Sequence, residues 1–186
     1  PLRLVGSEMC IRDRSKYIPE FANMKVVNEE TGEITAAKKQ MTVQDLLTHE
    51  SGLIYGIFDP QSDLGRQYFA AGSLRSDITA LELAQNLAAV PLRFEPGTKW
   101  HYSRSTDVLG AVIEVAAGKS LDVLLNERIF EPLGMGETTF YVNASKADRI
   151  AHPIHGEMAD PLDVQPMLSG GGGLHSTTED YARFAN

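Results

Sequence analysis

Residues 41–53 read MTVQDLLTHESGL, and this stretch sets the first expectation about the fold. Thr42 stands three residues before Asp45, the spacing of a capping box, in which a hydroxyl accepts a free backbone N–H of the first helical turn. Asp45 also places a negative charge at the positive end of the helix. The Ser51-Gly52 pair that follows offers a glycine suited to a left-handed cap. We therefore expect a helix that begins at Thr42 and ends near Gly52.

Outward from this stretch, further start and stop signals predict a largely helical chain. Toward the N-terminus, residues 25–34 indicate a small hairpin or loop excursion with Gly32 at the turn. Toward the C-terminus, Thr79 begins a full capping box, and Ser120 is expected to cap another helix. Helices are expected at 61–70, at 79–88, at 106–117 with Gly118 closing it, and at 121–129 with Pro132 and Gly134 ending it; a strand is expected at 138–142, a short helix or turn at 144–150, and a last helix after Ser176 or Thr177.

The composition is that of a globular domain with an acidic balance. The chain has 186 residues, enough for one domain with a core, and is 42% hydrophobic and 23% charged. Its net charge is -8, whereas a nucleic-acid interface needs clustered Lys and Arg, so no nucleic-acid partner is expected. No apolar run reaches the roughly 18 residues that a membrane span requires, so no membrane span is expected.

Metal binding and disulfides are not expected either. Cys10 is the single cysteine, so it can form neither an internal disulfide nor a thiolate zinc site. His152 and His155 are three residues apart, but Pro153 between them disfavours the helix that would place them on one face. We predict no metal site and no cofactor, and the compartment stays open.

The N-terminal stretch, residues 1–14, reads PLRLVGSEMCIRDR and shows no period of two or of 3.6. The run VGSEMCIRDR resembles translated sequencing-adapter read-through. We expect residues 1–14 to be a non-native leader and residues 15–186 to be one partial domain without repeats or linkers.

Complete catalytic signatures are absent from the sequence. The nearest approach to a Gly-x-Ser-x-Gly nucleophile elbow is Ser51, which has His49 where a glycine is required. Residues 118–120, GKS, match the end of a phosphate-binding loop, but Ile113 occupies the place of its first glycine. No Ser-x-x-Lys occurs in the 186 residues.

Five blocks of the chain, in collinear order, carry a resemblance to a known family. They are residues 41–53 (MTVQDLLTHESGL), 94–103 (FEPGTKWHYS), 106–110 (TDVLG), 129–135 (IFEPLGM) and 171–184 (GGGLHSTTEDYARF). The chain resembles the serine β-lactamase-related family, which includes class C β-lactamases, D-alanyl-D-alanine carboxypeptidases and family VIII esterases. A single block would be weak support, whereas five in the right order span most of the chain from Ser15 onward.

The resemblance implies a set of site residues. The family takes its nucleophile from a Ser-x-x-Lys, a base from a Tyr-x-Asn or Tyr-Ser-x motif, and substrate contacts from a late Lys-Thr-Gly-like strand. Only the second motif falls inside this chain, as residues 102–104, YSR. The resemblance implies Tyr102 as the catalytic base, with Ser103, Arg104, Gly172 and Gly173 binding substrate. Arg104 stands where the lactamases have asparagine, which favours an ester or peptide hydrolase over an antibiotic-degrading lactamase.

The resemblance also implies the fold class and the function. The fold is expected to be α+β, of the β-lactamase/transpeptidase type, with this chain supplying mainly the helical region and few short strands, and with apolar surface left uncovered where the sheet would pack. The expected function is part of a serine hydrolase that cleaves a small ester or amide substrate (a carboxylester, a β-lactam or a D-Ala peptide) through an acyl-enzyme, the part itself being inactive because it lacks the nucleophile. A non-catalytic binding protein on the same scaffold is the alternative, since a scaffold does not guarantee chemistry.

Overall fold

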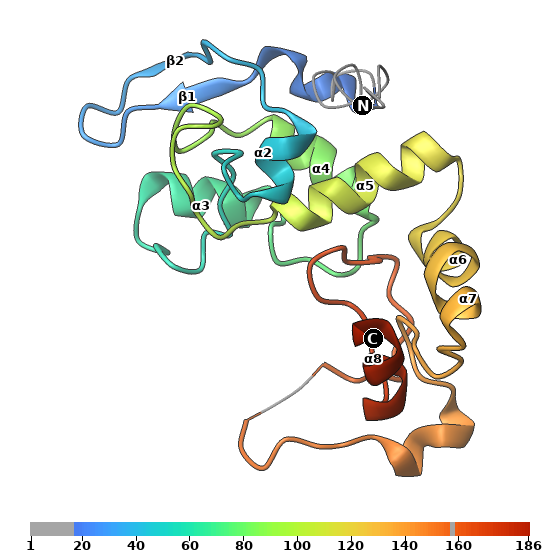
Figure 1. Cartoon of the computed structure of the whole chain (residues 1–186). Helices are drawn as coiled ribbons and strands as arrows, with labels where there is room; N and C mark the ends of the chain where they lie inside the picture. The colour runs from blue at the N-terminus through green and yellow to red at the C-terminus, as the bar shows by residue number, and fades with distance from the viewer. Residues whose placement is uncertain (1–16, 157–158) are drawn as a thin grey trace, which may run out of the picture.

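A two-stranded antiparallel sheet lies at one edge of a group of helices in the N-terminal half of the chain (Figure 1). The computed structural model describes residues 17–156 and 159–186, so the expected leader at 1–14 lies outside the described residues. Strand β1 (Lys25–Val27) pairs with β2 (Ile34–Ala36), and the connection contains Gly32 at a φ of 72°. The predicted hairpin with Gly32 at its turn is confirmed.

Helices make up most of the remaining regular structure, as the sequence predicted. The first is a short 3₁₀ turn, η2 (Pro19–Asn23), which precedes β1. The others in chain order are α2 (Val43–Leu47), α3 (Asp63–Ala70), α4 (Ala80–Ala88), α5 (Ser105–Ala117), α6 (Leu121–Leu125), the π-helical turn η3 (Asn126–Phe130), α7 (Glu131–Leu133), the 3₁₀ helix η4 (Ala144–Arg149) and α8 (Thr178–Ala185).

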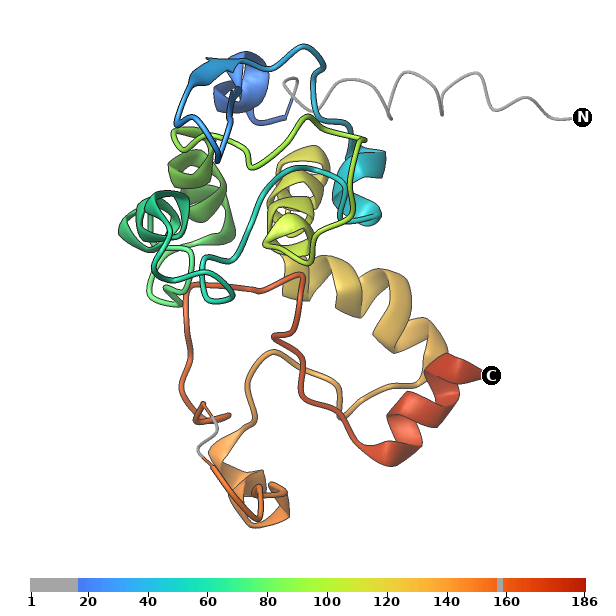
Figure 2. The same ribbon diagram turned by 90° about the vertical axis from the view of Figure 1, so that its left-hand side faces the viewer.

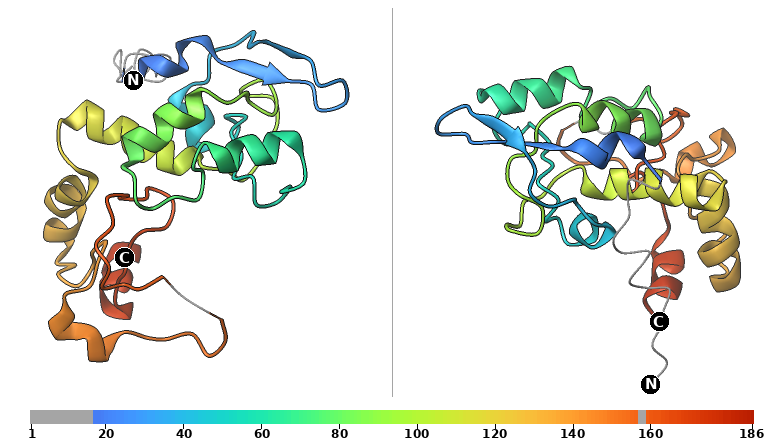
Figure 3. Two further views of the ribbon diagram at one scale, coloured as in Figure 1. Left: turned by 180° about the vertical axis from the view of Figure 1, so that it is seen from behind. Right: turned by 90° about the horizontal axis from the view of Figure 1, so that it is seen from above.

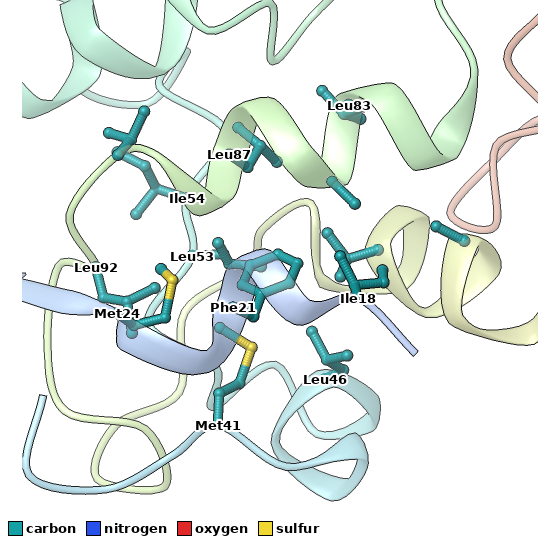
Figure 4. Close-up of a cluster of buried hydrophobic side chains, with 14 of the residues drawn as sticks. Ile18, Phe21, Met24, Met41, Leu46, Leu53, Ile54, Leu83, Leu87 and Leu92 are labelled. Carbon is teal, nitrogen blue, oxygen red and sulfur yellow. The ribbon is translucent and has the colours of Figure 1, made fainter. Parts of the chain in front are cut away.

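The core lies where η2, α2, α4 and α5 meet (Figure 4). Phe21 of η2 is fully buried and faces the apolar sides of α2 and α4, which contribute Leu46 and Leu87. Each large aliphatic side chain removed from water contributes on the order of 2 kcal/mol. The cluster packs α2 against α5, and the end of α2 and the start of α5 border the candidate site described below.

Local capping signals predicted several helix ends correctly. Thr42 and Asp45 form the predicted capping box of α2, and Thr79 and Glu82 form that of α4. Gly118 ends α5 at a φ of 63°, a left-handed conformation that glycine adopts without steric cost.

The predicted end of α2 near Gly52 is wrong. The helix ends at Leu47, and the left-handed position is taken by His49, at a φ of 59°. Gly52 also has a positive φ, but it serves a close approach to another segment: a Cβ there would lie 2.4 Å from the Phe94 carbonyl oxygen. At Gly52 this tertiary contact, which the local sequence does not encode, decides the conformation.

Two further expectations are corrected. Ser120 makes no side-chain cap to α6; the free N–H of Leu121 is satisfied by the Glu114 carboxylate at 2.9 Å instead. Residues 138–142 do not form a strand, because within the described residues their ladder pairing is limited to an isolated bridge between Thr139 and His175. Without a neighbouring strand, a single bridge does not extend into a ladder.

The helix expected at 121–129 is longer than predicted and changes its winding. It passes through η3 and α7 as far as Leu133, and Gly134 ends it at a φ of 67°. Pro132 lies in the first turn of α7 and does not end the helix. The turn that precedes Pro132 has the wider π winding.

The helices after α5 form an arm that extends away from the N-terminal helices, as Figure 2 shows from the side and Figure 3 from behind, while the segment around Met167 and Gly170 returns to pack against them. This arm carries α6, α7, η4 and α8, the last capped by Thr177 as predicted. Apolar side chains remain exposed on these helices and on the end of α5, including Val115, Tyr181 and Phe184. Within the described residues, no helix is both long and apolar enough to cross a membrane.

Candidate active site

Tyr102 lies on the irregular segment before α5 and is 44% exposed. Three aromatic rings pack against it: the ring centre of Tyr102 is 5.0 Å from that of His49, 5.3 Å from that of Tyr55 and 6.4 Å from that of Phe58. Tilted aromatic pairs at these separations hold a ring in place while one edge stays accessible. Tyr102 is therefore both fixed and open to solvent.

Backbone hydrogen bonds join the segment before Tyr102 to the segment after α2. The Gly97 N–H donates to the Glu50 carbonyl at 2.8 Å, and the His101 N–H donates to the His49 carbonyl at 2.9 Å. Gly97, which follows Pro96 in a turn, has a φ of 74°, a conformation that glycine adopts without steric cost. Two sequence blocks about fifty residues apart thus lie side by side, and Tyr102 is placed by their contact.

His49 occupies the left-handed position of a Schellman motif at the end of α2. The Glu50 N–H donates to the Asp45 carbonyl at 2.8 Å, and the His49 N–H lies 3.4 Å from the Leu46 carbonyl. Glycine is the usual residue at this position, because a side chain in the left-handed region costs roughly 1–2 kcal/mol. Reversing the chain at the end of α2 does not require a histidine at position 49, so the strained backbone there points to a role for the histidine side chain beside Tyr102.

Three fully buried serines form a chain behind Tyr102. The hydroxyl oxygens of Ser51 and Ser105 are 2.6 Å apart, and those of Ser105 and Ser103 are 2.7 Å apart. The Ser103 hydroxyl also lies 3.4 Å from Nδ1 of His49, which accepts the Ser103 backbone N–H at 3.3 Å. The structure thus places Ser103, expected from the resemblance to bind substrate, in an internal network.

Arg104 is engaged by protein groups on three sides. Its Nε donates to the Ser73 carbonyl, its Nη1 lies 3.1 Å from Oδ2 of Asp107, and its guanidinium carbon is 4.8 Å from the centre of the Tyr55 ring. The Arg104 side chain is 14% exposed and that of Asp107 is fully buried. The guanidinium links the loop of Tyr55 to the start of α5.

Burial and charge shift two titratable groups around Tyr102. Burial, reinforced by the nearby Asp107 carboxylate and opposed by Arg104, raises the pKa of Tyr55 to about 12. Burial lowers the pKa of His49 from 6.5, with the Asp107 charge acting in the opposite direction. Around neutral pH both side chains are therefore uncharged, the one a phenol and the other an imidazole.

The glycine run that follows Ser169 packs against the first turns of α5. A Cβ on Gly170 would lie 2.3 Å from the Thr106 carbonyl oxygen, and a Cβ on Gly171 would lie 2.7 Å from Oγ1 of Thr106. A Cβ on Gly172 would meet nothing within 4 Å, and one on Gly173 would lie 2.9 Å from Phe140. The first two glycines thus serve close backbone packing, and Gly172 is the one that borders open space.

Sequence reasoning missed three contributors to this site. Tyr55 lies under Tyr102, Asp107 neutralises Arg104, and Ser169 donates a hydrogen bond to Asp107. Asp107 had a usable signal, since it follows Arg104 by three residues at a predicted helix start, where the two side chains share a face. Tyr55 and Ser169 lie far along the chain and carried no local signal.

Elsewhere the described chain holds a hollow but no cluster of metal ligands. Across residues 17–156 and 159–186, no three His, Cys, Asp or Glu side chains converge as metal ligands would. A hollow of about 800 Å³ lies between η4 and the start of α8 and is lined by residues such as Glu137, Lys146 and His175. None of residues 102–104 lines it, so it is separate from the candidate site.

Known proteins resemble this chain over nearly its whole length. The beta-lactamase family matches residues 4–186. Protein Rv1367c of Mycobacterium tuberculosis is 32% identical over 199 aligned residues, which cover 95% of this chain and 47% of that protein. Esterase EstB of Burkholderia gladioli is 35% identical over 167 residues, covering 88% of this chain and 40% of the esterase. The chain therefore spans less than half the length of these relatives.

A solved structure supports the fold. The chain superposes on that of EstCE1, described as a hydrolase with promiscuous acyltransferase activity, with a TM-score of 0.70 and 25% identity, over 91% of this chain and 49% of the other. The fold is thus β-lactamase/transpeptidase-like, and the helices with one short two-stranded sheet form part of that α+β architecture. The predicted fold class is confirmed, and the chain belongs to the serine β-lactamase-related family of hydrolases and acyl-transfer enzymes.

Proposed function

We propose that this protein is a serine hydrolase that cleaves an ester or amide through an acyl-enzyme, with Tyr102 as the base. One observation carries the proposal: of the three residues of the YSR motif, Tyr102 keeps an exposed ring, whereas Ser103 is fully buried and the Arg104 side chain is only 14% exposed. An exposed phenol fixed by aromatic neighbours suits proton transfer to and from a bound substrate.

In the proposed reaction a serine hydroxyl attacks the substrate carbonyl while an oxyanion hole stabilises the developing charge. Tyr102 takes the serine proton and returns it to the leaving group, and water then releases the acyl group. A phenol titrates at about 10 in water, so it accepts a proton near neutral pH when a lysine ammonium stabilises the phenolate. We assign that role to the lysine of a Ser-x-x-Lys motif.

The substrate class we propose is a small ester, with amides as the second class. EstB is named an esterase and EstCE1 a hydrolase with promiscuous acyltransferase activity; the first name supports an ester substrate and the second supports acyl transfer. Gly172 and Gly173 remain proposed substrate contacts, Gly172 because it borders open space. Ser103 and Arg104 remain proposed members of the site. Their contacts favour an indirect role in substrate binding, in which Ser103 helps to position Tyr102 and Arg104 helps to position Tyr55.

We place the nucleophile outside residues 1–186, because no Ser-x-x-Lys occurs within them, and propose that these residues alone do not turn over substrate. Labelling with a fluorophosphonate, followed by intact mass and peptide mapping, tests this. The complete open reading frame should gain one label on a serine of a Ser-x-x-Lys, and residues 1–186 should gain none. A complete reading frame that contains no Ser-x-x-Lys and takes no label would refute the proposal and favour a binding protein on this scaffold.

A further inference from the structure

His49, whose side chain the proposed mechanism does not use, contacts the residue on each side of Tyr102. Its backbone carbonyl accepts the N–H of His101, and the Nδ1 of its side chain accepts the N–H of Ser103 at 3.3 Å. Its ring centre is also 5.0 Å from that of Tyr102. His49 thus contacts the residue before Tyr102, the residue after it and the Tyr102 ring itself.

The conformation of His49 makes these contacts informative. The Schellman motif needs only the backbone of this residue, and glycine would supply that backbone without strain. The side chain therefore does something that the turn does not require. The contacts that the side chain itself makes are those with Ser103 and with the neighbouring rings of Tyr102 and Trp100, the Trp100 ring centre lying 6.4 Å away.

The backbone N–H of Ser103 fixes the tautomer of the imidazole. A backbone N–H can only donate, and this one is directed at Nδ1 of His49 at 3.3 Å. Nδ1 is therefore the acceptor, and the proton of the neutral ring lies on Nε2. The hydroxyls of Ser103, Ser105 and Ser51 extend this contact into the interior, each within hydrogen-bonding distance of the next.

We infer that His49 is a positioning residue for Tyr102: a neutral imidazole, anchored through Nδ1 by Ser103 and the buried serine chain, fixes the phenol in its reactive orientation. The inference rests on the proposed function of Tyr102. It assigns the strained turn at the end of α2 and the buried serines to the same task, namely the placement of one side chain.

Nuclear magnetic resonance of the 186-residue chain, labelled with ¹⁵N-histidine and ¹³C-tyrosine, tests the geometry without turnover. His49→Gly removes the ring and keeps the turn. His49→Asn also tolerates the left-handed backbone, and its amide oxygen replaces Nδ1 as acceptor. His101→Asn is the matched control, because the His101 ring lies edge-on to Phe94 and its link to His49 is made by the backbone.

We expect an unprotonated Nδ1 on His49 and displaced Tyr102 ring signals in both His49 variants. Exchange protection of the Ser103 amide should be lost in His49→Gly and kept in His49→Asn. His101→Asn should leave the Tyr102 signals and the Ser103 amide as in the wild type. A protonated Nδ1, or Tyr102 signals that are unchanged in His49→Gly, would overturn the inference.

Ester hydrolysis by the complete gene product separates this inference from the proposed function. His49→Gly should lower kcat roughly 100-fold with KM changed less than about threefold, and His49→Asn should recover roughly tenfold of that loss. Full activity of His49→Gly together with an inactive Tyr102→Phe enzyme would overturn the positioning role alone. Full activity of Tyr102→Phe would overturn the proposed function, whatever the resonance data show for His49.

Discussion

Arg104 and Asp107 form an ion pair across the first turn of α5, with Nη1 3.1 Å from Oδ2 and the carboxylate fully buried. The pair joins three segments, since Arg104 lies over Tyr55 and Asp107 accepts the hydroxyl of Ser169 before the glycine run. The charge of each partner is compensated inside the protein by the other. The structure around Tyr102 therefore depends on this pair.

Removal of the Asp107 charge should destabilise the protein measurably. Asp107→Asn keeps the shape of the side chain and leaves the largely buried Arg104 guanidinium without a counter-charge, which should cost about 2 kcal/mol of unfolding free energy. Urea unfolding measures the loss. Asp77→Asn is the control, because its partner Arg75 and Asp77 itself are both exposed, and no measurable change is expected there. Equal losses in the two variants would contradict a structural role for the buried pair.

The glycine run offers a matched pair of substitutions. Gly170→Ala should cost about 1–3 kcal/mol of stability, because its Cβ would lie 2.3 Å from the Thr106 carbonyl oxygen and α5 or the loop must move. Gly172→Ala should stay within about 1 kcal/mol of the wild type, since nothing lies within 4 Å of its Cβ. Thermal unfolding of both variants checks the difference, and an equally stable Gly170→Ala protein would contradict the close packing.

Two helix starts that look alike in sequence should respond differently to the loss of their hydroxyls. Thr79→Ala removes a side chain that accepts the Glu82 N–H at 3.2 Å, which should cost about 1 kcal/mol. Ser120→Ala removes no capping hydrogen bond and should change stability by less than about 0.5 kcal/mol. Urea midpoints distinguish the two, and a larger loss for Ser120→Ala would show that Ser120 caps α6 after all.

Stability should fall as the pH drops below 6.5. The pKa of His101 is lowered by burial and by the positive charge of Arg93, and that of His49 is lowered mainly by burial. Because the folded state resists protonation of these rings, the unfolded state binds more protons between the lowered pKa and 6.5, and stability is lost across that interval; above it the two histidines contribute no slope. Urea unfolding at about pH 7.5 and about pH 5 should show the loss, and it should be smaller in His101→Gln. A loss of the same size in that variant would contradict the contribution of His101.

Short-range signals predicted much of the fold. The caps at Thr42, Thr79 and Gly118 were correct because each depends on hydrogen bonds within one helical turn. The end of α2 was wrong because the left-handed position falls on His49, which carries no glycine signal, and because Gly52 instead serves a close approach to Phe94, about forty residues away. Such contacts leave no periodic trace in the sequence.

The site was predicted less completely than the fold. Tyr102 came from resemblance to a motif, and its exposed ring is compatible with that role. The burial of Ser103 and the three partners of Arg104 depend on how α5 packs against the loops at Tyr55 and Ser73, which only the folded chain brings together. Composition and spacing could not have supplied those contacts.

The most direct test of the account is the rate of p-nitrophenyl ester hydrolysis by the complete gene product with one tyrosine hydroxyl removed at a time. Tyr102→Phe should lower kcat/KM by roughly 100-fold or more, because proton transfer to and from the substrate is lost. Tyr141→Phe, at a tyrosine that is 40% exposed against 44% for Tyr102, should stay within about twofold of the wild type. Equal rates in the two variants would contradict the assignment of Tyr102 as the base, and with it the central claim.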